Sequence, residues 1–417
     1  MRWSEGSLTN AATEAARPPA IDLSRGTNQT GVRIYNERLV LSLIRRHRSL
    51  PRAEIARLTG LSPQTITVIM RSLETDGLVV KLDRQRGKIG QPSVPFALDP
   101  DGAFSFGLKI GRRSNDLVLM DFTGGVRAAL HEADRYPTPA GVLDFVARAT
   151  RELTERIGPP ADRIAGIGVA APFELWSWEE QIGAPREILD QWRNFAIQEE
   201  IARLCPWPVF FCNDATAACG AELVLGRGAQ HQDFLYFFIG SFIGGGVVLN
   251  GTLYPGRTGN AGALGSMPIA SAAAGGGVAF GQLIRSASIY VLEHKLAAAG
   301  KDASILWRSP DDWGELGPLL DQWIDEVAGS LAFAILAAAS VIDFPAVVID
   351  GAFPAEVRAR IVAEARAKAA LLDHRGLSPV AIVEGSVGSG ARAIGGACLP
   401  LLANFARDRE VLFKDTV

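Results

Sequence analysis

Cysteine and long apolar runs are both scarce in this sequence. Only 4 of its 417 residues are cysteines, and they form no C-x-x-C pair. Three of them, Cys205, Cys212 and Cys219, recur at seven-residue intervals. This spacing argues against disulfides and against a thiolate zinc site, and it predicts reduced, buried thiols in a cytosolic protein. No apolar run reaches the roughly 20 residues that cross a membrane, so we expect no membrane partner.

The first 30 residues lack the apolar segment of a signal peptide. They are rich in alanine, threonine, serine and proline, which predicts a disordered lead over residues 1–30. A content of 48% hydrophobic and 21% charged residues is typical of a soluble globular protein with a large core. Because 417 residues exceed one typical domain, we expect two or three domains in a cytoplasmic protein.

Residues 51–80 have the pattern of a helix-turn-helix. We predict a short helix over 52–59, a turn at Gly60 in the left-handed conformation, and a second helix capped by Ser62. Apolar residues at helical spacing face inward from the second helix: Ile66, Ile69, Met70 and Leu73. The residues left outside are polar, as a helix that enters the DNA major groove requires. They are Gln64, Thr65, Thr67 and Arg71.

The segments on either side predict a winged module over residues 31–100. An amphipathic helix over 36–48 precedes the motif, and two β-prone runs at 78–82 and 94–98 follow it. The loop between these runs is basic and contains glycine, which is typical of a wing that reaches the minor groove. We expect four of its residues to contact DNA: Arg84, Arg86, Lys88 and Gln91.

Charge is distributed unevenly along the chain. Between Gly31 and Pro95 there are 12 Lys and Arg against 5 Asp and Glu, whereas the whole chain carries a net charge of −3. A basic module on an acidic body is the pattern expected of a protein that binds double-stranded DNA. A helical trio used only for protein contacts is the alternative, and it would explain neither the basic loop nor this asymmetry.

From about residue 103 the sequence alternates strands and helices, which predicts sheets with helices on both faces. Both halves of this body begin with a strand, a glycine turn and a second strand, so we expect two similar lobes with a cleft between them. The expected helices are 141–157 and 215–224. The expected strands are 105–110, 116–121, 164–170, 208–211, 234–239, 247–249, 346–349 and 380–384, with a glycine loop over 240–246.

Three motifs in this body are distinctive: GIGVAAP at 166–172, Asn213-Asp214 before an alanine-rich helix, and IGSFIGGGVVLNGTLYPGRTGNAGALG at 239–265. On these motifs the chain resembles the ROK family, which joins sugar kinases and sugar-responsive repressors on an actin-like, two-lobed ATPase fold. The resemblance implies an α/β body with a first lobe over 103–222 and a second over 223–417, the last helix returning to the first lobe.

The chain departs from the kinases of this family where ATP would bind. The resemblance implies an acid after the first strand that orients magnesium, but Lys109 stands there, with Arg112 and Arg113 following Gly111. Lysine offers no oxygen ligand to Mg²⁺. The second phosphate loop, usually Gly-Thr-Gly, has Phe242 in its last place. We therefore expect no Mg-ATP and no kinase activity, the alternative being that Lys109 or Arg112 neutralises a phosphate in another pose.

The sugar side of the family pattern is partly retained. Asp214 matches the catalytic base, and without ATP it can still accept hydrogen bonds from sugar hydroxyls. Asn213 and Asn260 match positions that contact sugar, and Gly259 allows close approach of the backbone. A strand-end turn and helix cap is the alternative role of Asn213 and Asp214.

The zinc site of the family is not retained. Where relatives have a zinc-binding histidine this chain has Ser266, and no cysteine follows before Cys398. We therefore expect no structural zinc, and we expect packing by Phe280, Leu283 and Ile284 in its place. The altered contacts favour a modified sugar, a sugar acid or a polyol as the ligand.

Together these features predict a sugar-responsive transcriptional regulator, a repressor that binds an operator as a homodimer or higher oligomer. A sugar kinase with a regulatory DNA-binding domain is the enzyme alternative. A scaffold built on an inactive kinase body is the third, and it would bind neither sugar nor operator.

Overall fold

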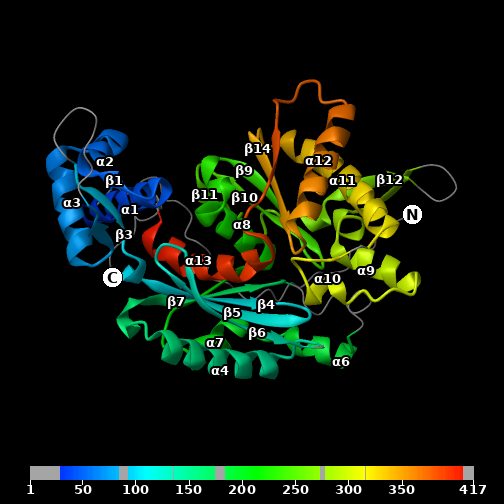
Figure 1. Ribbon diagram of the computed structural model, residues 1–417, viewed down its shortest axis with the longest axis horizontal. Coiled ribbons are helices and arrows are strands. Elements are labelled where there is room, and N and C mark those ends of the chain that lie inside the picture. The colour runs from blue at the N-terminus through cyan, green and yellow to red at the C-terminus, as the bar shows by residue number, and fades with distance from the viewer. Residues whose placement is uncertain are drawn as a thin grey trace, which may run out of the picture.

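The structure is a computed structural model that describes residues 29–83, 93–134, 136–173, 184–272, 278–314 and 316–406. It places a small winged module beside two lobes, each built on a five-stranded sheet (Figure 1). The predicted wing contacts Arg84, Arg86, Lys88 and Gln91 lie outside the described residues, as does the predicted lead apart from its last two residues.

The winged module has the expected order of elements. They are α1 (Gln29–His47), β1 (Leu50–Pro51), α2 (Arg52–Thr59), α3 (Pro63–Thr75), β2 (Val79–Lys81) and β3 (Pro95–Leu98), with strand order β1-β3-β2. Gly60 ends α2 at φ 72° and donates its N–H to the Ala56 carbonyl. Helix α1 begins at Gln29 rather than at residue 36. The sequence did not indicate the earlier start, because the first turns of the helix bury only Gly31 and show no apolar periodicity.

The first lobe carries a mixed sheet in the order β6-β5-β4-β7-β8. Its strands are β4 (Phe104–Ile110), β5 (Ser114–Asp121), β6 (Val126–Ala133), β7 (Ile164–Ala171) and β8 (Val209–Asn213). Helices α4 (Pro139–Ile157) and α7 (Ile197–Leu204) cover one face, and the short α6 (Arg186–Leu189) lies near its end. The last helix, α13 (Ala391–Phe405), packs on the other face against β4 and β7.

Glycines in β4 and β7 let α13 approach this sheet closely. A methyl group on Gly107 would lie 2.1 Å from the Ala393 carbonyl oxygen, and one on Gly168 would lie 1.9 Å from that of Gly396. Any side chain at either position would therefore push α13 off the sheet. The close packing accounts for part of the glycine content of the 166–172 motif.

The second lobe carries a sheet in the order β11-β10-β9-β14-β15. Its strands are β9 (Phe234–Ile239), β10 (Ile243–Leu249), β11 (Thr252–Leu253), β14 (Ala346–Gly351) and β15 (Ala381–Glu384). Helices α9 (Ile289–Ala298), α10 (Ile305–Arg308), α11 (Pro318–Ala339) and α12 (Ala355–Leu371) belong to this lobe. Helix α8 (Asp214–Leu225) packs on β10 and on α13, so α8 and α13 lie between the two sheets (Figure 1).

The prediction of a glycine loop over 240–246 is wrong for its second half. Strand β10 begins at Ile243, and Gly244–246 belong to it. These glycines serve packing instead: a methyl group on Gly244 would lie 2.7 Å from Cβ of Ala215, and one on Gly246 would lie 2.5 Å from Cβ of Cys219. Helix α8 can thus lie directly on the strand.

The winged module shares one hydrophobic core with the body. Val40 and Ile44 of α1 belong to the same buried cluster as Met120 of β5 and Leu401 of α13. Phe122 stacks edge-on against Phe405 with 4.8 Å between ring centroids. Arg45 of α1 lies over the Phe122 ring and donates to its carbonyl oxygen at 2.8 Å. The module is therefore packed onto the body rather than held by a linker alone.

The prediction that Phe280, Leu283 and Ile284 pack together in the second lobe is wrong for Phe280. Leu283 and Ile284 are buried as expected, but Phe280 is 83% exposed, because it lies on the two-stranded β12–β13 hairpin (Pro268–Ala272 and Val278–Gln282) outside both sheets.

Among the described helices, α11 alone is long and apolar enough to cross a membrane by length and composition. Its buried face includes Trp323 and Leu331, which pack in the core of the second lobe.

Candidate functional sites: the recognition helix and the interlobe cluster

Helix α3 presents the predicted DNA-contacting residues on one surface. Ser62 caps the helix by accepting the Thr65 N–H at 3.1 Å. Gln64, Thr67 and Arg71 are exposed, whereas Thr65 is half-buried and shares a hydrogen bond with Ser62. The Thr67 hydroxyl donates to the Pro63 carbonyl at 2.8 Å, which leaves its methyl group and an oxygen lone pair for a ligand.

Sequence analysis missed Val68 on this surface. Its side chain is 68% exposed between Thr67 and the buried Ile69, although valine is a typical core residue. An exposed aliphatic group beside polar ones suits the methyl group of thymine in the major groove. The signal was present in the sequence, because Val68 falls off the spacing of Ile66, Ile69 and Leu73.

The second candidate site lies where the two lobes meet. It comprises Lys109, Arg112, Asp116, Asp214 and Arg392, which we call the interlobe cluster. Lys109, Arg112 and Asp116 come from the β4–β5 hairpin, Asp214 begins α8, and Arg392 lies in the first turn of α13. Three segments that are far apart in the sequence thus contribute to one cluster of charged side chains.

Asn213 and Asp214 serve both as a helix cap and as members of this site. The Asn213 side-chain oxygen accepts the N–H groups of Ala215 and Thr216 at 3.0 and 3.4 Å. One Asp214 oxygen accepts the Ala215 N–H, and the other pairs with Arg392 at 3.4 Å. The capping role therefore uses one oxygen of each side chain, while the second Asp214 oxygen faces Arg392.

Lys109 is held as a cation by its own strand pair. Its side chain is 10% exposed, and its Nζ donates to Asp116 and to Ser114 at 2.6 Å each. Burial and the nearby Arg392 lower the pKa of Lys109, and Asp116 opposes that shift. Burial would raise the pKa of Asp116, but Lys109 and His131 bring it below its usual range.

Arg112 and Arg113 connect the lobes. The Arg112 guanidinium lies 3.9 Å from the centre of the Phe242 ring, which belongs to the loop between β9 and β10. Arg113 pairs with Glu293 of α9 at 2.6 Å and lies over the Trp307 ring of α10 at 4.4 Å. Burial lowers the pKa of Arg112 to about 9, even though Asp214 acts to raise it.

Arg392 was not singled out from the sequence, yet it is the partner of Asp214. Its side chain is 13% exposed, and its guanidinium also lies over the Phe238 ring at 5.2 Å. The only sequence signal was an arginine directly after a glycine-rich turn at the start of a helix. The pairing of residues 178 positions apart required the fold.

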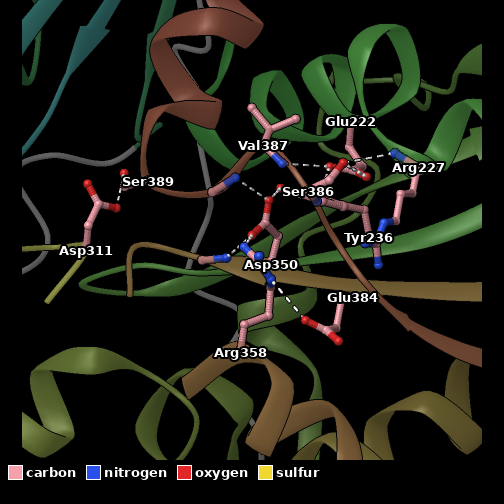
Figure 2. A network of polar contacts seen from close by, with 12 residues as sticks. Glu222, Arg227, Tyr236, Asp311, Asp350, Arg358, Glu384, Ser386, Val387 and Ser389 are labelled. Atoms are coloured by element: carbon pink, nitrogen blue, oxygen red, sulfur yellow. Dashed lines mark hydrogen bonds and ion pairs between the residues drawn. The ribbon is translucent and has the colours of Figure 1, made fainter. Parts of the chain in front are cut away.

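The loop before α13 is fastened by two buried carboxylates (Figure 2). Glu222 of α8 accepts the N–H groups of Ser386 and Val387 at 3.0 and 3.3 Å. Asp350 of β14 accepts the N–H of Gly388 at 2.8 Å, and it also accepts from Arg358 and Tyr236. The start of α13 is thereby tied to α8 and to the second sheet.

The other predicted sugar contacts lie on the loop after β11. Gly259 has φ 77° with no atom within 4 Å of an added methyl group, and Asn260 is exposed. Gly262 of the same loop packs on Gly246 of β10, which in turn lies against Cys219 of α8. The loop therefore rests on the strand beside α8, and direct contact between Asn260 and Asp214 is not part of this arrangement.

The interlobe cluster has a cation, Lys109, at the position where the family resemblance implies an acid that orients magnesium. A metal bound to ATP needs oxygen ligands, and the position nearest the turn offers the ammonium group of Lys109. The Lys109 side chain lies close to Gly111, because a methyl group on this glycine would be 2.7 Å from Cε of Lys109. Within the described part of the chain, no group of three or more His, Cys, Asp or Glu residues is arranged to hold a metal ion. All four cysteines are free thiols.

Comparison with known proteins gives two family matches. Residues 105–401 match the ROK family, and residues 35–80 match a winged helix-turn-helix DNA-binding family. Together these two matches cover the winged module and both lobes.

Curated relatives are similar at about one quarter identity. The chain is 25% identical to the xylose repressor of Bacillus spizizenii over 242 residues, 58% of this chain and 62% of that protein. It is 24% identical to the DNA-binding transcriptional dual regulator NagC of Escherichia coli K12 over 250 residues, 57% of this chain and 58% of that protein. The match thus spans less than two thirds of the length of these relatives.

Solved structures share the fold. A ROK family transcriptional regulator, a homologue of the E. coli MLC protein, aligns with a TM-score of 0.63 at 20% identity, covering 92% of this chain and 99% of its own. A ROK family glucokinase from Streptomyces griseus in complex with glucose and AMPPNP aligns with a TM-score of 0.55 at 20% identity, covering 71% and 99%. The first alignment extends into the winged module, and the second is confined to the length of a two-lobed body.

Proposed function

The chain belongs to the ROK family, and from this membership we propose that it is a sugar-responsive, DNA-binding transcriptional regulator that acts as a repressor. The winged module binds the operator, and the interlobe cluster binds the sugar. One observation carries the proposal: α13 contacts the winged module at one end and bears Arg392 beside Asp214 at the other. The names of the xylose repressor and NagC support the same function.

Helix α13 is the physical route between the two sites. Its 15 residues span about 22 Å. The loop before it is held by Glu222 and Asp350, and Arg38 of α1 donates to the Ala406 carbonyl just after it. A ligand that draws Asp214 away from Arg392 changes the contacts of the first turn of α13. Because the helix is packed along its length, that change is transmitted to α1.

We infer further that the chain has no kinase activity. By the family resemblance Asp214 matches the base of a kinase, but Lys109 stands where an acid that orients magnesium is expected, and Arg392 lies near Lys109. Phosphoryl transfer depends on a positioned metal and on charge that complements the transferred group. The protein thus binds a sugar in the cytoplasm without converting it. It binds a near-palindromic operator as a homodimer, with one recognition helix in each half-site.

The test measures operator binding and ligand binding on the same protein. An operator is selected from random double-stranded DNA, and its binding to the full chain is followed by fluorescence anisotropy with and without members of a sugar panel. We expect one sugar class to change the Kd for DNA. Replacing Asp214 by Ala should abolish this response, while the variant still binds the operator; unaltered sugar affinity in that variant would refute the site.

A coupled assay for ADP distinguishes the proposed regulator from a sugar kinase. The same protein is incubated with ATP, Mg²⁺ and each sugar. ADP formation that depends on both the sugar and Asp214 would establish a kinase and overturn the non-enzymatic proposal.

A further inference from the structure

The interlobe cluster contains more positive charge than its own carboxylates neutralise. Lys109 is paired with Asp116, and Arg392 is paired with Asp214. Arg112 lies near the same groups, yet within the described residues it makes no ion pair with a carboxylate. The positive charge of Arg112 is therefore uncompensated at a buried position, where such a charge costs free energy.

Two arginine nitrogens in the cluster also lack acceptors. The Nε atoms of Arg112 and Arg392 have essentially no exposed surface and no hydrogen-bond partner among the described residues. A buried N–H without an acceptor is unusual in folded proteins, and it points to a missing group. The acceptors that fit a guanidinium edge best are the paired oxygens of a carboxylate or a phosphate.

The aromatic contacts hold these guanidinium groups in place. Arg112 lies over the Phe242 ring at 3.9 Å, and Arg392 lies over the Phe238 ring at 5.2 Å. A guanidinium that stacks through its face still offers its N–H groups in the plane of its edge. Both arginines are thus pre-oriented for an acceptor that does not come from the protein.

We propose that the ligand of the interlobe cluster is an anionic sugar, bound with its phosphate or carboxylate group against Arg112 and Arg392 and its hydroxyls against Asp214. This inference rests on the proposed function and narrows its ligand class. The hydroxyl oxygens of a neutral sugar could accept from the Nε–H groups, but a neutral sugar would leave the positive charge of Arg112 uncompensated. The lobes must move apart to admit the ligand, because neither Nε atom is exposed in the present arrangement.

The experiment compares sugars that differ only in charge. Binding to the full chain is measured by calorimetry and thermal shift for matched sets: glucose, glucose 6-phosphate and glucuronate; N-acetylglucosamine and its 6-phosphate; xylose and xylonate; with inorganic phosphate alone as a further probe. We expect at least one charged member to bind tenfold or more tightly than its neutral partner. The phosphate and carboxylate arms identify which anion the site takes.

The variant Arg112→Gln tests whether Arg112 binds the anionic group of the sugar. It removes the charge but keeps a planar polar group on Phe242, and we expect the preference for the charged sugar to fall at least tenfold. Arg112→Lys keeps the charge and should retain part of the preference. The control is Arg113→Gln, which removes a cation from the same turn whose partner is Glu293; the preference should survive. Operator binding without ligand reports that each variant is folded.

The outcomes separate this inference from the proposed function. Equal binding of neutral and charged sugars, or a preference that Arg112→Gln leaves intact, would overturn the anionic ligand while the regulator stands. Binding of inorganic phosphate alone, without any sugar, would also overturn it. If no sugar of any kind binds, the proposed function fails together with it.

Discussion

A few side chains decide how α3 contacts DNA. The polar residues Gln64, Thr67 and Arg71 could be placed from the sequence, because helical spacing separates them from the buried residues. Residue type alone does not place Val68, since valine is usually buried. Its position off the spacing of Ile66, Ile69 and Leu73 indicated exposure, and the structure shows that its side chain is 68% exposed.

Replacing Gln64 by Ala should weaken operator binding by about 1–3 kcal/mol, because a bidentate contact to a base edge contributes about that much. Val68→Ala should relax the preference for thymine at one position with a smaller loss of affinity. Anisotropy with the selected operator and its single-base variants measures both effects. Arg57→Ala, at an exposed ion pair on α2, is the control. A loss of sugar affinity equal to the loss of DNA affinity would count against the assignment.

Asp121 gives the stability of this region a defined pH dependence. Burial would raise its pKa, but hydrogen bonds from Thr123, Arg127 and Gly125 bring the pKa below the usual range. A carboxyl group whose pKa is lowered on folding stabilises the protein above its unfolded pKa of about 4, and that stabilisation is lost as the pH falls through the folded value.

Asp121→Asn should therefore lower the free energy of unfolding by about 1–3 kcal/mol at pH 7. The difference between wild type and variant should shrink as the pH is lowered towards 3. Urea unfolding across this pH range measures it. A constant difference at all pH values would show that the carboxylate charge is not the cause.

At the scale of elements, the structure follows the predicted order of helices and strands closely. The strands at 234–239 and the helix at 52–59 have the predicted bounds, because apolar periodicity and glycine turns mark them clearly. The region 244–246 was misassigned as loop, because glycine there serves close packing of α8 rather than a turn. Local sequence shows that a glycine is present but not which helix lies on it.

Helix α13 is the element whose role was least visible in sequence. The resemblance implied that the last helix returns to the first lobe, and the structure adds its contacts with the second sheet, with α8 and with the winged module. These contacts join residues from opposite ends of the chain. No local pattern reports them, because each depends on the completed fold.

Truncating Phe405 should uncouple the two sites. Phe405→Ala removes its stacking on Phe122, and the loss of an aromatic pair should cost at least about 0.5–1.5 kcal/mol of stability. We expect the variant to bind sugar normally and to show a reduced effect of sugar on DNA binding. Anisotropy with and without ligand measures the effect, and Leu371→Ala, at a highly exposed residue of α12, is the control. An unchanged ligand effect would exclude this route.

For the molecule as a whole, the shared core makes the winged module and the body one mechanical unit. The motifs in the sequence separate residues 31–100 from the body, but Val40 and Ile44 lie in one buried cluster with Leu401. Composition and motif spacing could predict the winged module and the two-lobed body. They could not predict that the two parts share a core, since this depends on α13 returning to the start of the chain.

Coupling in such a unit must be reciprocal. If a sugar changes operator affinity by some factor, the operator must change sugar affinity by the same factor, typically about 5- to 150-fold. Calorimetric titration of the sugar with free protein and with the protein–operator complex measures the second factor, and anisotropy measures the first. Factors that differ beyond error would mean that the two measurements do not report one coupled equilibrium.

The stacking of Arg112 on Phe242 and the pairing of Arg113 with Glu293 hold the lobes together before any ligand arrives. The concentration of sugar needed for a response therefore depends on how strongly these contacts hold the lobes together. Substitutions at Arg113 or Glu293 would therefore retune the sensitivity of the regulator while leaving its choice of sugar and its choice of operator intact.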